Sequence, residues 1–153
     1  MNENWPRWFF ASVSKHFTTL APSITFIEGT HRQTPPDKTH AEFRMDGPRV
    51  RPVPGGDIYN WIAVNILFNT AMDSQEFHEK HRLVGEIVSA FTESIPIFRY
   101  GDGPDDDGEQ IGCFALLDRG LDTIRVNHFG QIDPAIRLEQ GTIEGHYETY
   151  LTP

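Results

Sequence analysis

This chain of 153 residues has little cysteine, little positive charge and no long apolar run. The single cysteine, Cys113, excludes an internal disulfide, and its strand-like context IGCFALL predicts a small buried side chain in a reducing compartment. Only 13 Lys and Arg residues stand against 22 Asp and Glu residues, a net charge of −9, which disfavours a protein that coats nucleic acid. Because MNENWPRW has neither a basic start nor a hydrophobic segment behind it, we expect a soluble, unprocessed protein without a membrane span.

The commonest catalytic and cofactor motifs are also missing. The sequence has no GxSxG, no GxGxxG after a strand, no GxxxxGK[ST] and no paired CxxC. His78 and His81 are three residues apart, whereas a metalloprotease helix needs a spacing of four, a position that Arg82 occupies here. The acidic run 102–109 lacks EF-hand spacing, because Gly103 stands where the first aspartate is needed. These absences remove the commonest sequence-level cases for hydrolase, dinucleotide, P-loop and zinc functions, and we assign no catalytic, metal or cofactor-binding residue.

An apolar content of 38%, with 11 Phe, is enough for a sizeable core, and no linker divides the chain, so we predict one domain over residues 1–153. The spacing of apolar residues predicts an N-terminal helix from Asn4 to about Leu20 and a second helix, with Asp73 and Glu76 as a capping box, to about residue 92. Alternating or short apolar segments predict strands at SITFIEG, 41–46, 58–69, IPIFRY, IGCFALLD, DTIRVNHFG and RLEQGTIEGHYETYL. This order predicts an α+β fold, a mainly antiparallel sheet with two principal helices packed on one face.

The alternation also predicts which side chains are buried. In the strand 58–69, Ile62, Val64, Ile66 and Phe68 form the apolar face. In the closing strand, we expect the glycines of the apolar face to make room for a helix or a neighbouring side chain, or to mark a bulge. The inner stripe of the second helix is predicted to consist of Phe77, His81, Val84, Val88 and Phe91.

Two loops are candidates for contact with a partner. Segment 47–57, GPRVRPVPGGD, is predicted to project from the sheet; its arginines can hold an anionic ligand or line an extended hairpin arm, and we favour the arm. The acidic loop is predicted to be solvated or to face a basic patch on a partner. Together with the outward face of the closing strand, these loops give ten candidate oligomer or partner contacts: Arg49, Arg51, Pro54, Asp102, Asp105, Asp106, Asp107, Glu144, His146 and Glu148.

Several of these segments together resemble the tail-terminator proteins of long-tailed bacteriophages. The resemblance is carried by the amphipathic N-terminal helix, the strand ending in FRMDGP, the strand WIAVNILFNT, the helix EFHEKHRLVGEIVSAF followed by IPIFRYG, and the closing strand TIEGHYETYL. It spans most of the chain and rests on the order of elements and the character of the strands. Segment 30–39 and the Asp-rich loop have no counterpart in the family.

The resemblance implies a virion structural protein of the tail or neck, assembled in the host cytoplasm. Such proteins form a hexameric ring at the head-proximal end of the tail tube, where they stop tube growth and join tail to head. The implied partners are further copies of the chain, the tail tube protein and head-neck connector proteins, with DNA passing through an acidic lumen without specific binding. A head-completion or connector protein of the same neck, a small metal- or ligand-dependent α+β enzyme, and a host-encoded ligand-binding domain remain as alternatives.

Overall fold

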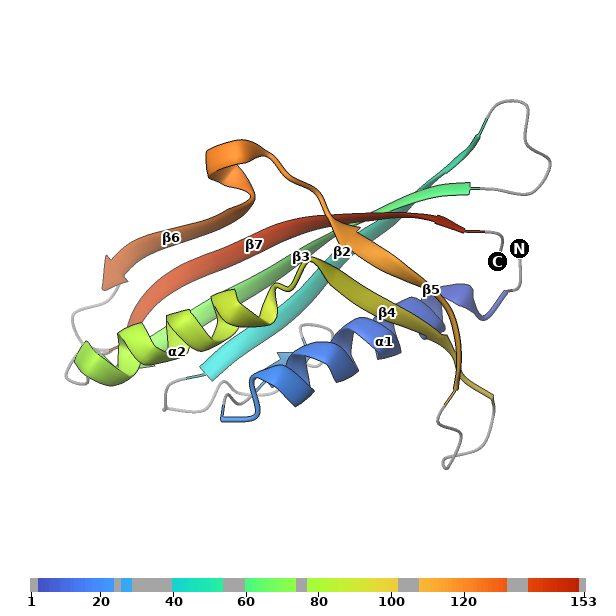
Figure 1. The fold of residues 1–153 in the computed structure, drawn as a ribbon. Helices are drawn as coiled ribbons and strands as arrows, with labels where there is room; N and C mark the ends of the chain where they lie inside the picture. Colours follow the sequence, from blue (N-terminus) through green and yellow to red (C-terminus); the bar gives the residue numbers. More distant parts are fainter. Residues whose placement is uncertain are drawn as a thin grey trace.

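The computed structural model describes residues 3–23, 26–28, 40–53, 60–73, 77–101, 108–131 and 138–151. Within these ranges, two α-helices and one 3₁₀ turn are combined with a single sheet (Figure 1). In chain order the elements are α1 (Trp5–Leu20), β1 (Phe26–Glu28), β2 (His40–Pro52), β3 (Asn60–Asp73), α2 (Phe77–Ala90), β4 (Ser94–Arg99), β5 (Glu109–Leu116), η1 (Gly120–Asp122), β6 (Ile124–Gln131) and β7 (Leu138–Leu151).

The sheet has seven strands in the order β1-β2-β3-β7-β5-β4, and β6 also pairs with β7. All pairs are antiparallel except β1 with β2. At the centre, β3 and β7 pair over their whole length, from Asn60 opposite Leu151 to Asp73 opposite Leu138. The other edge of β7 is shared, since residues 139–145 pair with β6 and residues 147–148 pair with β5. The strand β7 is therefore the element that most of the sheet is built around.

Both helices pack on one face of the sheet, which confirms the predicted α+β fold (Figure 1). The four apolar residues predicted to be buried in β3 are 0–2% exposed. Phe9, Val13 and Phe17 of α1 lie against this face, and the Phe17 ring centroid is 5.0 Å from that of Phe68 and 4.9 Å from that of Phe91. The apolar face of the strands, with period 2, and the apolar face of the helix, with period 3.6, thus pack together in one aromatic core.

The strand β2 continues well beyond the predicted end at residue 46. Its pairing with β3 shifts between Asp46 and Arg49 and then resumes, from Arg49 opposite Ala63 to Pro52 opposite Asn60. Gly47 has φ +111°, a conformation that only glycine adopts readily, so the chain bulges there without leaving the sheet. Proline is tolerated because, among the described residues, β1 pairs with β2 only at residues 41–43 and the rest of β2 has no neighbour on that edge. Prediction of a loop from residue 47 was therefore wrong, while the favoured hairpin arm is confirmed over 49–52.

The second helix differs from its prediction on its inner face. Its described part begins at Phe77, and the predicted capping box of Asp73 and Glu76 involves residues 74–76, which lie outside the described residues. His81 is exposed, whereas Ile87 is buried. The helix turns its C-terminal half toward the core, where Ile87, Ala90 and Phe91 are buried, and its first turns lie over the periphery. The predicted inner position of His81 was therefore wrong.

Cys113 is exposed, which contradicts the predicted buried thiol. Its neighbour Phe114 is fully buried, with its ring centroid 5.2 Å from that of Phe9. Because successive residues of a strand point to opposite faces, burial of Phe114 places Cys113 on the outward face of β5.

The glycines of β7 make room for neighbours, as predicted. A Cβ atom at Gly145 would lie 2.7 Å from Cδ1 of Phe91, the residue that follows α2. A Cβ atom at Gly141 would lie 2.7 Å from the backbone oxygen of Asn127 in β6. Gly145 therefore lets the end of α2 close onto the sheet, and Gly141 lets β6 do so.

Candidate functional site

The face of the sheet opposite the helices is covered by neither helix, and we call it the outer face (Figure 1). It is formed by the alternate residues of β2, β3 and β7 that do not enter the core. Register places Arg49 and Glu148 on either side of Ala63, and Asn65 directly opposite His146. Polar and charged side chains from strands that are distant in sequence are thereby brought side by side.

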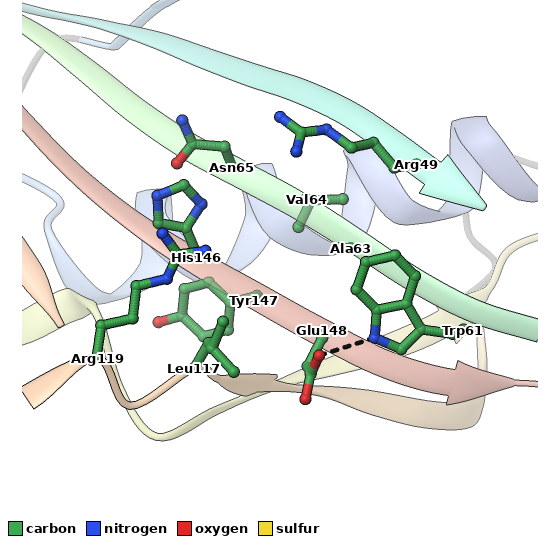
Figure 2. Close-up of a pocket in the computed structure, with 10 residues that line it drawn as sticks. All are labelled: Arg49, Trp61, Ala63, Val64, Asn65, Leu117, Arg119, His146, Tyr147 and Glu148. Atoms are coloured by element: carbon green, nitrogen blue, oxygen red, sulfur yellow. Dashed lines mark hydrogen bonds between the residues drawn. The ribbon is translucent and has the colours of Figure 1, made fainter. Parts of the chain in front are cut away.

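Two hollows on the outer face share lining residues and form what we call the outer groove; Figure 2 shows the residues that line the first of them. One has a volume of about 70 Å³ and the other of about 160 Å³, and both are lined by Arg119 and His146. Arg49, Asn65 and Glu148 also line the first hollow. The second is completed by Asp122, Arg125 and Glu144.

At the end of the groove nearest the hairpin arm, Trp61 contacts two charged side chains. Its Nε1–H donates a hydrogen bond of 2.8 Å to Oε2 of Glu148 (Figure 2). The guanidinium carbon of Arg51 lies 5.1 Å from the centroid of the Trp61 ring, a cation–π arrangement. Tyr150, directly opposite Trp61 on β7, is 58% exposed. Trp, Tyr and Arg are the residues enriched at energetically important points of protein interfaces, and here all three lie together on an open face.

The imidazole of His146 lies in an environment that disfavours its protonation. Burial is the main cause that lowers the pKa of His146, and the positive charge of Arg119 lowers it further. Arg49 and Arg125 act in the same direction, while Glu144 opposes them. The charged groups that shift this pKa are thus three guanidinium groups and one carboxylate.

The structure brings together five of the ten predicted contact residues, namely Arg49, Arg51, Glu144, His146 and Glu148. Sequence alone assigned them to two separate surfaces, the arm and the closing strand. The pairing of β2 with β3 and of β3 with β7 makes them one surface. The other five predicted residues, Pro54, Asp102, Asp105, Asp106 and Asp107, lie outside the described residues.

Among the residues of this surface that were not predicted as contacts are Trp61, Asn65, Arg119 and Arg125. Trp61 and Asn65 carry a signal in the sequence, because they alternate with the apolar face of β3 and therefore belong to the outer face. Arg119 and Arg125 carry none, since their approach to His146 depends on how the chain turns after β5 and on the register between β6 and β7.

Two large apolar side chains in and just before β6 are exposed. Leu121 of η1 is fully exposed and Phe129 of β6 is 61% exposed. In the part of the chain that the structure describes, β6 pairs with β7 on one edge only. An edge strand that carries exposed apolar residues is a further candidate surface for a protein partner.

No group of three or more His, Cys, Asp or Glu side chains within the described ranges could hold a metal ion. None of the helices seen in those ranges is long and apolar enough to cross a membrane. Comparison with protein-family models and with curated proteins found no match for this chain. Arguments about function therefore rest on the fold and on the outer face.

Proposed function

We propose that this chain is a structural subunit of a bacteriophage tail neck, which forms a ring at the head-proximal end of the tail tube. The ring ends tube growth and joins tail to head, and the subunit performs no catalysis. The observation that carries the proposal is the division of the sheet into two unlike faces. The inner face holds the core beneath both helices, whereas the outer face is open, polar and continuous with the hairpin arm of β2 and β3 (Figure 1).

A ring subunit needs at least two different surfaces, because a head-to-tail interface joins unlike patches of neighbouring copies. The outer face, with Trp61, Tyr150 and Arg51, offers one such surface. The edge strand β6, with Phe129 and the adjacent Leu121, offers another. A net charge of −9 supports an acidic lumen that repels phosphate groups and lets a duplex pass without being held.

The proposal is tested by mixing the purified protein with tail tubes of its own virus and imaging the product by electron microscopy. We expect a ring that caps the tube at one end and stops further addition of the tube protein. A head-completion or connector protein would instead bind the head vertex and leave bare tubes unchanged. A monomer that ignores tubes and turns over a small substrate would end the proposal.

As a matched pair for this experiment, Tyr150→Ser removes an exposed aromatic side chain from the outer face, and Leu20→Ser removes one exposed apolar side chain from α1. Both side chains are about half exposed, so neither change disturbs the core. We expect Tyr150→Ser to reduce the capping of tubes and Leu20→Ser to leave it unchanged.

A further inference from the structure

Two arginine side chains of the outer groove have no ionic partner among the described residues. Arg125 pairs with Asp122 at 3.7 Å and with Glu144 at 3.8 Å. By contrast, the guanidinium groups of Arg49 and Arg119 form no ion pair or hydrogen bond with any residue that the structure describes. An acidic protein thus holds two unpaired arginines at the edge of the same hollow.

The turn that carries Arg119 is fixed in place by hydrogen bonds. The Asp118 carboxylate accepts from the backbone N–H of Gly120 at 2.8 Å and from the Thr123 hydroxyl at 3.0 Å. The backbone N–H of Leu117 donates to the carbonyl oxygen of His146 at 2.8 Å, which fastens the start of the turn to β7. The backbone of Arg119 is therefore fixed next to β7, and its side chain lines the hollow together with that of His146.

The charges around the smaller hollow leave room for one negative charge. Two guanidinium groups, of Arg49 and Arg119, and one carboxylate, of Glu148, line it, so the formal charge is +1 with a neutral His146. The larger hollow shares Arg119 and adds Arg125, Asp122 and Glu144, so the groove as a whole is formally neutral and its local positive surplus lies in the smaller hollow, beside Arg49. This arrangement suits a monoanion rather than the dianion of a phosphate monoester.

The groove also holds a buried acceptor without a partner. Oδ1 of Asn65 is buried, and no hydrogen bond to it is made within the described chain. Asn65 lies opposite His146 in the register of β3 and β7, and Figure 2 shows the two side chains next to each other, with Arg49 and Arg119 approaching from opposite sides. Buried polar atoms are rarely left unpaired, so the site is incomplete as it stands.

We propose that the outer groove binds a carboxylate, with Arg49 and Arg119 donating hydrogen bonds to its oxygens beside His146. Arginine pairs readily with carboxylates through two parallel N–H donors. A bound carboxylate favours protonation of the imidazole, and the imidazolium ring then has a second N–H for Oδ1 of Asn65. Binding therefore takes up a proton and strengthens as pH falls. The charged groups that face His146 and set this balance are Arg49, Arg119, Asp122, Arg125, Glu144 and Glu148.

An Asp or Glu side chain of a second copy is the source that the composition favours. Each copy has 22 acidic against 13 basic residues and so carries surplus carboxylates. This choice of source rests on the proposed ring, whereas binding of a carboxylate does not. A free small-molecule carboxylate is the other source of the same chemistry.

The first experiment tests the chemistry without assembly. The side-chain NMR signals of His146, assigned with His146→Asn, are followed in dilute protein while sodium acetate replaces sodium chloride at constant ionic strength. We expect a saturable shift, a higher pKa of His146 in acetate, and a loss of affinity of roughly tenfold in Arg49→Gln and Arg119→Gln. Arg44→Gln is the matched control, because Arg44 is an exposed residue of β2 that does not line the groove. Circular dichroism confirms that each variant is folded.

Absence of a saturable shift, or an equal shift in Arg119→Gln and the parent, overturns the proposal. Tighter binding of inorganic phosphate than of acetate overturns the choice of a carboxylate. The second experiment counts rings on tail tubes for the parent, Arg119→Gln and Arg44→Gln. Loss of rings only with Arg119→Gln supports a second copy as the source. Equal ring formation by all three proteins, or no ring even with the parent, overturns that source, and the acetate titration then decides the groove alone.

Discussion

Replacement of Gly145 by alanine tests the packing of β7 against α2 with a single added methyl group. The new Cβ would lie 2.7 Å from Cδ1 and 2.8 Å from Cε1 of Phe91, well inside normal contact. The Phe91 ring cannot swing away easily, because it is 5% exposed and is enclosed by the rings of Phe17, Phe68 and Tyr147, with centroids 4.9, 5.9 and 6.4 Å away. The backbone or the aromatic cluster must therefore move.

The expected cost follows from these contacts. Overpacking of a close-packed core typically costs about 1–3 kcal/mol. Alanine recovers about 0.5–1 kcal/mol of this, because glycine loses more conformational freedom on folding. The difference between the middle values of the two ranges is a loss of about 1 kcal/mol of unfolding free energy, which for a chain of this size lowers Tm by roughly 2–4 °C.

Gly85→Ala is the matched control, since the same change is made in the middle of α2, where nothing lies within 4 Å of the added Cβ. It should stabilise the protein by about 0.5–1 kcal/mol. Urea unfolding, followed by tryptophan fluorescence and circular dichroism, gives both values as shifts of the midpoint at constant m. If Gly145→Ala is as stable as the parent, or if both changes have the same sign, the argument from close packing is wrong.

Further predictions concern the core strand, pH and the exposed thiol. Ile66→Asp places an unpaired charge in the core and should abolish soluble folding. Asn69→Asp, on the outer face, should not. Soluble expression of both variants would show that the predicted buried side of β3 is wrong. Burial lowers the pKa of His16 below its usual value of 6.5, and the hydrogen bond to the Ala90 carbonyl oxygen opposes this only in part. As pH falls, His16 is therefore protonated in the unfolded state before it is protonated in the folded state. Unfolding free energy should therefore be highest above pH 6.5 and fall as pH drops through the folded-state pKa, with a shallower slope in His16→Gln. Cys113 should react with iodoacetamide in the native protein, and neither alkylation nor a chelator should change Tm; a lower Tm in chelator would point to a bound metal.

The sequence predicts much of this fold because most of its strands alternate cleanly. Ile62 to Phe68 in β3 and Gly141 to Leu151 in β7 point inward at every second residue, and the structure confirms both faces. An alternating strand can bury only one of its two sides, and the positions of its apolar residues determine which side that is. The N-terminal helix is equally clear, with Phe9, Val13 and Phe17 buried as their spacing indicates.

The remaining features depend on tertiary contacts that no local pattern contains. His81 shares the helical spacing of apolar residues, yet α2 meets the sheet mainly through its C-terminal half, which leaves His81 exposed. Pro48 and Pro52 indicate a loop, yet along this stretch β2 has no outer neighbour within the described ranges, and an edge strand tolerates proline. Arg119 lies 27 positions before His146 in the chain, and only the turn after β5 brings the two together.

The same register of β7 builds both the core and the proposed carboxylate site. Gly145 and Tyr147 point inward, where the glycine accommodates Phe91 and the Tyr147 hydroxyl donates to the carbonyl oxygen of Thr92 at 2.8 Å. His146, between them, points outward into the groove. A slip of one residue would bury His146 against Phe91 and expose Tyr147, so the contacts that fix the core also fix the histidine opposite Asn65. The groove therefore lies at the centre of the sheet, where the backbone of β7 is paired on both sides. A ligand can bind there only when β7 is in the register that also builds the core.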